Sequence, residues 1–322
     1  MIRKLVKFAV RSLLLLLVLA CAAAIAFRLA AALRETADRD QIMPASGKTI
    51  ATRSGRIFIQ DKGDTQAIPV VLIHGTAAWS QLWWRTTDAL TSSGFRVIAL
   101  DLPPFGFSDR PGDYTRGAQA ARIDNILTTL GVTKAIIVGH SFGAGTALEY
   151  VMRHPDRTRG LVLVDAALGL TAPPSDPPWL LHPRWIRELL VSLTVTNPLA
   201  TKTLLSQLIA NKAAADAQTI GILQTPMRLK NSTADIADWL LYFTSADRGA
   251  LSADRRAVAG IAAPTALLWG DKDTVTPLAQ ARDLQTLLPK ASLDVLPGLG
   301  HIPQIEDSIA FNKALIAALR GM

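Results

Sequence analysis

The pentapeptide Gly139-His140-Ser141-Phe142-Gly143 decides how this chain is interpreted. It follows the apolar run 135–138, which predicts a buried strand, and it precedes residues 142–153, which favour a helix. A strand that turns sharply into a helix leaves no room for side chains beside the turn, so small residues are required two positions either side of Ser141. The pattern therefore predicts a strained turn that lifts the Ser141 hydroxyl above a sheet edge, at the amino end of a helix.

A serine hydroxyl is a weak nucleophile, so this turn predicts a base and an acid elsewhere in the chain. The apolar run 265–269 ends in Gly270-Asp271-Lys272-Asp273, and a short predicted strand over 292–296 ends in Gly298-Leu299-Gly300-His301. Both loops follow the serine in the order acid, then histidine. We predict that Ser141 is the nucleophile, that His301 is the general base and then acid, and that Asp273 orients and stabilises the imidazolium.

Other residues compete for these roles. Asp165 closes the apolar run 161–164 and could reach His301 from a neighbouring strand end, and Asp271 lies two residues from Asp273. The other four of the five histidines sit at strand ends, at a helix end or in a proline-rich segment, and they are His74, His140, His154 and His182. His301 alone follows the last predicted strand, between a glycine and Pro303.

Five motifs stand in a fixed order along the chain. They are Val70-Val71-Leu72-Ile73-His74-Gly75-Thr76, the stretch from Phe95-Arg96-Val97-Ile98-Ala99-Leu100-Asp101 to Ser108-Asp109, and the pentapeptide and two loops quoted above. In these motifs the chain resembles the α/β-hydrolases over about residues 50–320. The resemblance implies an α/β fold whose mostly parallel central sheet carries helices on both faces and a helical cap insertion. Alternating strand-like and helical runs in the first and last thirds favour the same sheet.

The resemblance also implies roles for further residues. The backbone N–H groups of Phe142 and Thr76 would form an oxyanion hole, with Ala77 as an alternative donor. The segment between Asp165 and Pro264 shows helical patterns at 183–193, 198–209, 213–223 and 233–243, and in this family it is a cap over the site. We predict that three tryptophans bind substrate: Trp79, Trp179 and Trp239. The expected divisions are an anchor and linker at 1–40, the core at 48–168 and 261–322, and the cap at 169–260.

The amino end predicts a membrane anchor. Residues 1–11 contain four cations and no acid, and the uncharged apolar run 12–27 resumes at 29–33 after Arg28. Sixteen residues are fewer than the roughly 20 that span a bilayer, unless Arg11 and Arg28 snorkel. A cleaved signal peptide is the rival interpretation, and Cys21 resembles a weak lipoprotein box. The early cations predict a single pass, with the catalytic domain periplasmic or otherwise extracytoplasmic.

The remaining composition excludes several classes of function. Half of the formal net charge of +8 lies in the first 40 residues, so the rest carries too small an excess to indicate a nucleic-acid partner. The sequence shows no zinc-ligand cluster, phosphate-binding glycine loop or dinucleotide fingerprint. We therefore expect chemistry without a cofactor or metal.

The identity of the nucleophile narrows the reaction. Haloalkane dehalogenases and epoxide hydrolases of this fold use aspartate where this chain has Ser141, and carbon–carbon bond hydrolases tend to have a glycine-rich stretch where it has Thr76-Ala77-Ala78. We therefore predict a serine hydrolase that cleaves a small, lipophilic carboxylic ester through an acyl-enzyme. The alternatives are an amidase or peptidase, a cofactor-free perhydrolase or haloperoxidase, and a non-catalytic membrane-tethered binding protein. The sequence leaves the oligomeric state open.

Overall fold

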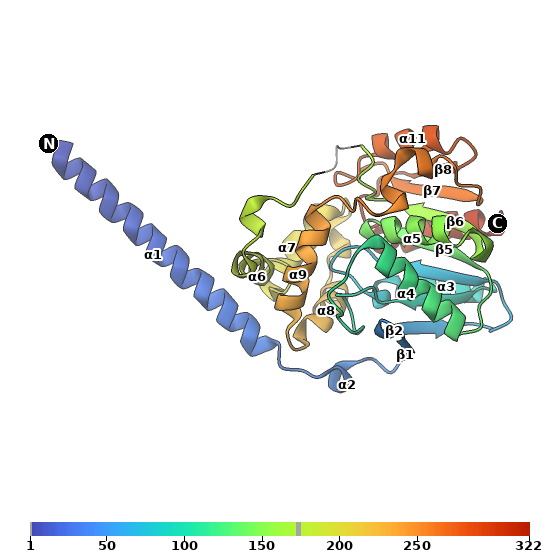
Figure 1. The fold of residues 1–322 in the computed structure, drawn as a ribbon, viewed down its shortest axis with the longest axis horizontal. Coiled ribbons are helices and arrows are strands. Elements are labelled where there is room, and N and C mark those ends of the chain that lie inside the picture. The colour runs from blue at the N-terminus through green and yellow to red at the C-terminus, as the bar shows by residue number, and fades with distance from the viewer. Residues whose placement is uncertain (1, 172–174) are drawn as a thin grey trace.

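A computed structural model describes residues 2–171 and 175–322, and an eight-stranded sheet forms its centre (Figure 1). The strands are β1 (Lys48–Thr52), β2 (Gly55–Lys62), β3 (Pro69–Ile73), β4 (Arg96–Leu100), β5 (Ala135–His140), β6 (Thr158–Val164), β7 (Thr265–Gly270) and β8 (Ser292–Leu296). Their order is β1-β2-β4-β3-β5-β6-β7-β8. Only β2 runs antiparallel to its neighbours, so the prediction of a mostly parallel sheet is confirmed.

Helices cover both faces of the sheet because successive residues of each strand point to opposite sides. In β3, Val71 and Ile73 join one apolar cluster and Val70 and Leu72 join the other. The first cluster is covered by α4 (Arg116–Thr129), α5 (Phe142–Arg153) and α11 (Leu278–Leu287), and the second by α3 (Trp84–Ser92) and α13 (Ser308–Arg320). This double cover is the layered α/β architecture that the sequence predicts.

A helical cap is inserted between β6 and β7, at the carboxyl edge of the parallel strands (Figure 1). Its helices are α6 (Arg184–Leu193), α7 (Pro198–Leu208), α8 (Ala217–Gln224) and α9 (Ser232–Thr244). Leu205 and Ile209 pack with Leu82 and Ile302 of the core, and Trp239 packs with Phe105. A third cluster joins Trp79 of the core with Leu229, so buried apolar contacts hold the cap to the core at several places.

Shorter helices complete the connections. They are α2 (Arg39–Ile42), α10 (Arg255–Val258), α12 (Pro303–Glu306) and the 3-10 turns η1 (Ser80–Trp83), η2 (Pro155–Arg157), η3 (Trp179–Leu181), η4 (Lys212–Ala214), η5 (Pro226–Arg228) and η6 (Leu251–Ala253). The domain limits given above stay predictions.

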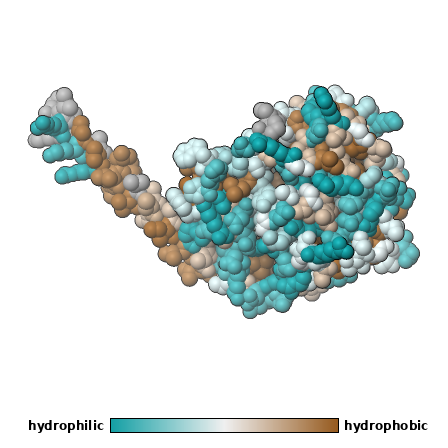
Figure 2. Space-filling model, viewed as in Figure 1, coloured by the Kyte–Doolittle hydropathy of each residue, from teal (hydrophilic) through white to brown (hydrophobic). Residues whose placement is uncertain are grey.

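The helix α1 (Ile2–Arg34) projects from the body and touches it only near its carboxyl end, where it packs against α6 (Figure 1). Figure 2 shows an apolar shaft with a hydrophilic tip at the amino end. Its segment Val6–Arg34 has the length and hydropathy of a membrane crossing, with a mean hydropathy of 2.6 over its most apolar window. The predicted amino-terminal helix is therefore present in the fold.

Candidate active site

Ser141 occupies a strained turn between β5 and α5. Its backbone angles, φ 52° and ψ −123°, are rarely adopted by residues other than glycine. The flanking glycines are required by contact, since a Cβ on Gly143 would lie 2.2 Å from the carbonyl oxygen of His74 and one on Gly139 would lie 2.7 Å from Ala144 Cα. The turn sets the Ser141 hydroxyl at the carboxyl edge of the sheet, beneath the cap.

His301 reaches this hydroxyl from the loop after β8. Its Nε2 lies 2.8 Å from Ser141 Oγ, and its Nδ1 lies 2.8 Å from Asp273 Oδ2. The backbone N–H of His301 donates to the carbonyl of Leu208 in the cap, at 3.0 Å. The structure therefore brings together the three predicted catalytic side chains, which lie 160 and 28 residues apart in sequence. This arrangement can move a proton from the serine to the histidine.

Asp273 is held as a carboxylate in the loop after β7. Oδ1 accepts the N–H groups of Val275 and Thr276 at 2.7 and 2.9 Å, and Oδ2 accepts the Thr276 hydroxyl at 2.6 Å. Burial by itself raises the pKa of Asp273, but hydrogen bonding from His301 and Thr276 outweighs burial and lowers it. Asp273 is therefore ionised at neutral pH and fixes the tautomer of His301.

Asp165, the rival acid, directly follows β6 but contacts a different neighbour. Its Oδ1 accepts the N–H of Gly270 at 2.9 Å, and its buried Oδ2 has no hydrogen-bond partner among the described residues. Burial first, and then the charge of Asp273, raise the pKa of Asp165 well above its ordinary range. Asp271 accepts the N–H of Gly298 at 2.7 Å. Neither carboxyl group hydrogen-bonds His301 in the described structure.

Two other histidines shape the loops around the site. His74 Nδ1 donates to the carbonyl of Gly75 at 2.8 Å, and its Nε2 accepts the N–H of Leu102 at 2.9 Å. His140 Nε2 donates to the carbonyl of His301 at 2.7 Å. Burial is the main reason that the pKa is lowered to about 4 for His74 and to about 3 for His140. Both rings are therefore neutral and hold the loops in place through these hydrogen bonds, which is consistent with their exclusion as the general base.

The predicted oxyanion donors lie on either side of Ser141. Phe142 follows it at the start of α5, and Gly75 lies so close that a Cβ there would be 3.0 Å from Ser141 Cβ. In the described structure the N–H groups of Phe142, Thr76 and Ala77 have no hydrogen-bond acceptor. All three amides are free to bind a developing oxyanion, and Ala77 has a φ of 57° in the turn. The choice of Phe142 and Thr76 stays a prediction.

The three predicted pocket tryptophans are placed differently. Trp239 is next to the site, with its ring centroid 5.2 Å from that of Phe142. Trp79 is only 2% exposed and belongs to core–cap packing, because its indole N–H donates to the carbonyl of Ile222 and its ring packs edge-on against Phe107. Trp179 is 80% exposed on the surface of the cap. Of the three tryptophans, only Trp239 therefore lies beside the reacting centre, and Trp79 and Trp179 lie elsewhere.

A cavity of about 100 Å³ lies between the oxyanion loop and the cap. The core contributes Thr76, Ala77, His140 and Ile302, and the cap contributes mainly aliphatic side chains from α7 and α8. The cap residues are Thr194, Val195, Thr201, Leu204, Leu205, Leu208, Leu223, Gln224 and Met227. Our sequence reasoning missed them because it favoured aromatic residues. The available signal was the repeat of leucine at 204, 205 and 208 on one turn of a helix.

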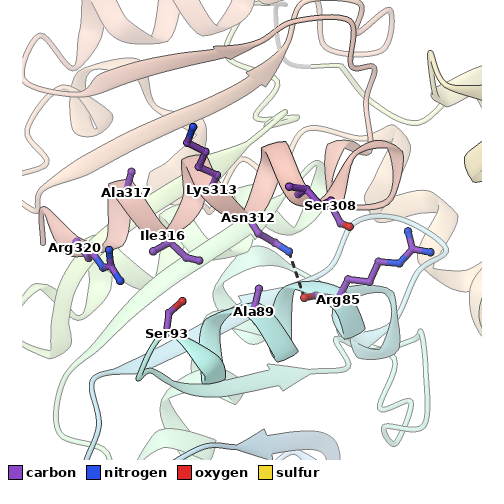
Figure 3. A pocket seen from close by; sticks show the side chains of 10 residues that line it. Arg85, Ala89, Ser93, Ser308, Asn312, Lys313, Ile316, Ala317 and Arg320 are labelled. Carbon is purple, nitrogen blue, oxygen red and sulfur yellow. Dashed lines mark hydrogen bonds between the residues drawn. The ribbon is translucent and has the colours of Figure 1, made fainter.

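Larger hollows lie outside this cavity. A groove of about 690 Å³ borders Phe142 and Thr276. Another hollow, of about 630 Å³, lies between α3 and α13 (Figure 3). There Asn312 donates to the carbonyl of Arg85 at 3.3 Å, and no residue of the triad lines the hollow.

A serine, histidine and aspartate aligned at the carboxyl edge of a mostly parallel sheet, under a helical cap, define a hydrolase of the α/β class. The model of the alpha/beta hydrolase fold family matches residues 68–308, and the chain belongs to that family.

Curated relatives cover most of the chain. It is 30% identical over 268 residues to a 2-hydroxy-6-oxononadienedioate/2-hydroxy-6-oxononatrienedioate hydrolase of Comamonas testosteroni, which covers 80% of this chain and 89% of the relative. It is 27% identical to the mouse mesoderm-specific transcript protein, over 86% of each chain.

Solved structures share the fold. A meta-cleavage product hydrolase from Pseudomonas fluorescens superposes with a TM-score of 0.71 at 24% identity, covering 85% of this chain and 98% of the other. A membrane phospholipase A superposes with a TM-score of 0.68 at 24% identity and covers 98% of both chains. At these identities the likeness concerns the fold alone.

Proposed function

We propose that this protein hydrolyses a carboxylic ester through an acyl-enzyme on Ser141. The observation that carries the proposal is the pair of 2.8 Å contacts from His301 to Ser141 and to Asp273. Ser141 Oγ attacks the ester carbonyl while His301 Nε2 takes its proton, and Asp273 stabilises the imidazolium. The N–H groups of Phe142 and Thr76 bind the oxyanion, an effect worth about 3 to 4 kcal/mol per donor in other enzymes.

The second half of the reaction reverses these transfers. When the tetrahedral intermediate collapses, His301 gives its proton to the leaving alkoxide and the alcohol departs. A water molecule then attacks the acyl carbonyl, and His301 takes its proton. Collapse of the second intermediate breaks the bond between the acyl carbon and Ser141 Oγ, which recovers its proton from His301. The products are a carboxylic acid, an alcohol and the unchanged enzyme.

The cavity supports an apolar acyl group of limited length. Its walls are mainly aliphatic, and its volume is about 100 Å³. An apolar cavity of about 150 Å³ accommodates benzene, so this one accommodates an acyl chain of roughly four carbons. We therefore expect short-chain esters to be the preferred substrates and longer acyl chains to be limited by the leucines of α7.

Labelling and mutation test the mechanism together. A fluorophosphonate probe should modify the wild-type protein on Ser141, as read by peptide mass spectrometry. The Ser141→Ala variant should neither be labelled nor hydrolyse p-nitrophenyl butyrate, with a loss of kcat of about 10⁴-fold or more. A Ser141→Ala protein that cleaves the ester at the wild-type rate would refute the proposal. Parallel assays with aminoacyl amides and with peroxide and bromide distinguish the amidase and haloperoxidase alternatives.

The acyl pocket is tested by one pair of leucines on the same helix. Leu204 lines the cavity, whereas Leu199 is exposed to solvent. Leu204→Ala removes three carbons from the wall and should shift the preferred acyl length upward by roughly two carbons in a series of p-nitrophenyl esters. Leu199→Ala, the matched control, should keep the wild-type preference with water-soluble esters. An unchanged length profile in Leu204→Ala would contradict the placement of the acyl group.

Carbon–carbon bond hydrolysis is the second candidate, because several relatives are named as hydrolases of 2-hydroxy-6-oxo dienoic acids or of 2-hydroxymuconate semialdehyde, substrates whose hydrolysis would break a carbon–carbon bond. Their substrates, as named, are acids, and an acid requires a cation or several donors in its pocket. Within the described structure no charged side chain lines the cavity beside Thr76. The neighbouring groove is lined by Arg116, Arg248 and Arg255. Arg116 donates to the carbonyl of Leu168, and Arg248 and Arg255 form ion pairs with Asp176 and Asp283. Incubation with 2-hydroxy-6-oxo-6-phenylhexa-2,4-dienoate, followed by absorbance, distinguishes this candidate from an esterase.

We propose further that α1 anchors the protein in a membrane, with the catalytic domain on the extracytoplasmic side. Support comes from the apolar segment Val6–Arg34 and from the cations that precede residue 12. Because α1 is the only described helix that meets the criteria of a membrane span, deletion of residues 1–34 should release the enzyme from sedimented membranes. Carbonate extraction of the full chain should leave it in the pellet. Full release by carbonate would contradict the anchor.

A further inference from the structure

Exposed apolar side chains occur on the cap where η3 leads into α6. We call the set formed by Trp179, Leu180 and Trp185 the cap patch. Their side chains are 80%, 50% and 67% exposed. They come from η3 and the first turn of α6, so one continuous segment presents them. Clustered exposed tryptophan and leucine mark a surface that contacts another apolar phase.

The contacts between α1 and the cap show which way this patch faces. Arg28 forms an ion pair with Glu188 at 2.8 Å, and six residues later Arg34 donates to the carbonyl of Thr196 at 2.9 Å. The two segments therefore run in the same direction where they touch. Residues that precede Glu188, including Trp185, must lie toward the part of α1 that precedes Arg28. The cap patch thus begins beside the apolar shaft of the helix.

The depth of the patch follows from the helical rise. Trp185 precedes Glu188 by three residues, which is about 4.5 Å along α6, and this brings it level with Ile25 of α1. Ile25 belongs to the uncharged run that a bilayer would enclose, and Ala31, one to two turns later, is fully buried against the cap. The cap patch therefore reaches the level at which α1 leaves the hydrocarbon. Tryptophan prefers this interfacial depth of a membrane.

We propose that the cap patch inserts into the interfacial layer of the bilayer that α1 crosses. This inference rests on the proposed membrane anchor. The corner between α6 and α7 then lies just outside the hydrocarbon, because Arg34 contacts Thr196 there, while Thr194, Val195 and Thr201 of the same corner line the cavity. A lipophilic ester dissolved in the membrane meets the enzyme at this corner. The ion pair of Arg28 with Glu188 neutralises both charges at the same level.

Tryptophan fluorescence of the full chain tests the proposal. Of the seven tryptophans, Trp179 and Trp185 are strongly exposed, whereas Trp79, Trp83, Trp239 and Trp269 are buried. In phosphatidylcholine vesicles that contain lipid brominated near the head of its acyl chains, roughly a quarter of the emission should be quenched. The Trp179→Phe/Trp185→Phe variant should lose this quenching. Its substitutions lie on the surface and spare the active site.

A tryptophan on the opposite side of the body controls for non-specific contact with the lipid. Arg320 is exposed at the end of α13, near the carboxyl terminus, which Figure 1 places away from α1. Arg320→Trp in the double-phenylalanine background should show no quenching by the brominated lipid. Quenching at this position equal to that of the wild type would overturn the proposed orientation.

Vesicle flotation, run on the same samples, distinguishes failure of the patch from failure of the anchor. Protein that floats with the vesicles but shows no quenching keeps its anchor and overturns the insertion of the cap patch. Protein that does not float overturns the anchor and this inference with it, while ester hydrolysis in solution is unaffected. Floating, quenched protein whose chemical cross-links join two copies through the patch would assign it to a dimer and would also overturn the proposal.

Discussion

Replacement of Asp273 by asparagine separates the charge of the carboxylate from its position. Two backbone N–H groups, from Val275 and Thr276, point at Oδ1, so the carbonyl oxygen of an asparagine must occupy that place. The NH₂ group then occupies the place of Oδ2, 2.8 Å from His301 Nδ1. Since an NH₂ group donates, it requires Nδ1 to accept. The proton of the imidazole moves to Nε2, which can then no longer accept the proton of Ser141.

The size of the effect follows from this change of tautomer. The wrong tautomer removes general-base catalysis, and comparable substitutions in serine hydrolases lower kcat by about 10⁴-fold. We expect a loss of about 10³- to 10⁴-fold in kcat/KM, which corresponds to about 4 to 5.5 kcal/mol of transition-state stabilisation. The backbone hydrogen bonds to the side chain are kept, so the free energy of unfolding should change by about 1 kcal/mol or less.

Steady-state hydrolysis of p-nitrophenyl butyrate measures this loss, and urea unfolding checks the fold. Asp271→Asn is the matched control, because Asp271 contacts the N–H of Gly298 and the exposed Lys272 but not His301. The activity of this variant should stay within about threefold of wild type. Asp165→Asn tests the rival acid. Because the pKa of Asp165 is raised, its carboxyl group is protonated, and asparagine is a close substitute for it. The activity of this variant should therefore fall less than about tenfold. A nearly active Asp273→Asn enzyme together with an inactive Asp165→Asn enzyme would refute the assignment.

Two further predictions concern the frame of the site. Gly143→Ala should lower kcat/KM more than tenfold and destabilise the fold by about 2 kcal/mol or more, because its Cβ would lie 2.2 Å from the carbonyl oxygen of His74. Gly221→Ala is the control, because a Cβ added at this position of α8 meets no neighbouring atom within 4 Å. It should stabilise the fold by up to about 1 kcal/mol. Equal changes in the free energy of unfolding for the two variants, measured in urea, would contradict this reasoning. The second prediction concerns pH. Burial lowers the pKa of His140 from 6.5 to about 3. Between these pH values the unfolded chain binds a proton at His140 that the folded chain does not bind, so the folded state becomes less stable as the pH falls. At pH 5 this costs about 2 kcal/mol relative to pH 7, and His140→Gln should lose about that much less between the two pH values.

The central features of the fold could be predicted because they depend on local pattern. The runs that became β3, β5, β6 and β7 are continuous apolar segments, as buried parallel strands require. The hairpin of β1 and β2 escaped prediction because β1 is only partly buried and the apolar run of β2 is short, covering little more than residues 57–59. The cap helices were expected close to their observed positions, since leucine and tryptophan recur there at helical spacing.

The site was predicted less evenly. Ser141 and His301 stand in motifs whose order along the chain already suggests their meeting. Trp79 and Trp179 were expected to bind substrate because large aromatic residues near a site often do, yet one fills a core–cap contact and the other points to solvent. Which face of a loop or helix a tryptophan presents depends on the packing of distant segments, and no local pattern contains that information.

The sequence by itself predicted Ser141 as the nucleophile and the order of its partners, and it determined the apolar character of α1, because glycine spacing, strand-like runs and hydropathy act over a few residues. Only the tertiary structure decided between Asp273 and Asp165 as the partner of His301, since both follow neighbouring strands and differ in which backbone N–H groups they meet. It also decided that leucines of α7 form the wall of the cavity and that α6 of the cap packs against α1. These outcomes depend on how segments far apart in the chain pack against one another, and that packing is set only when the whole core is buried.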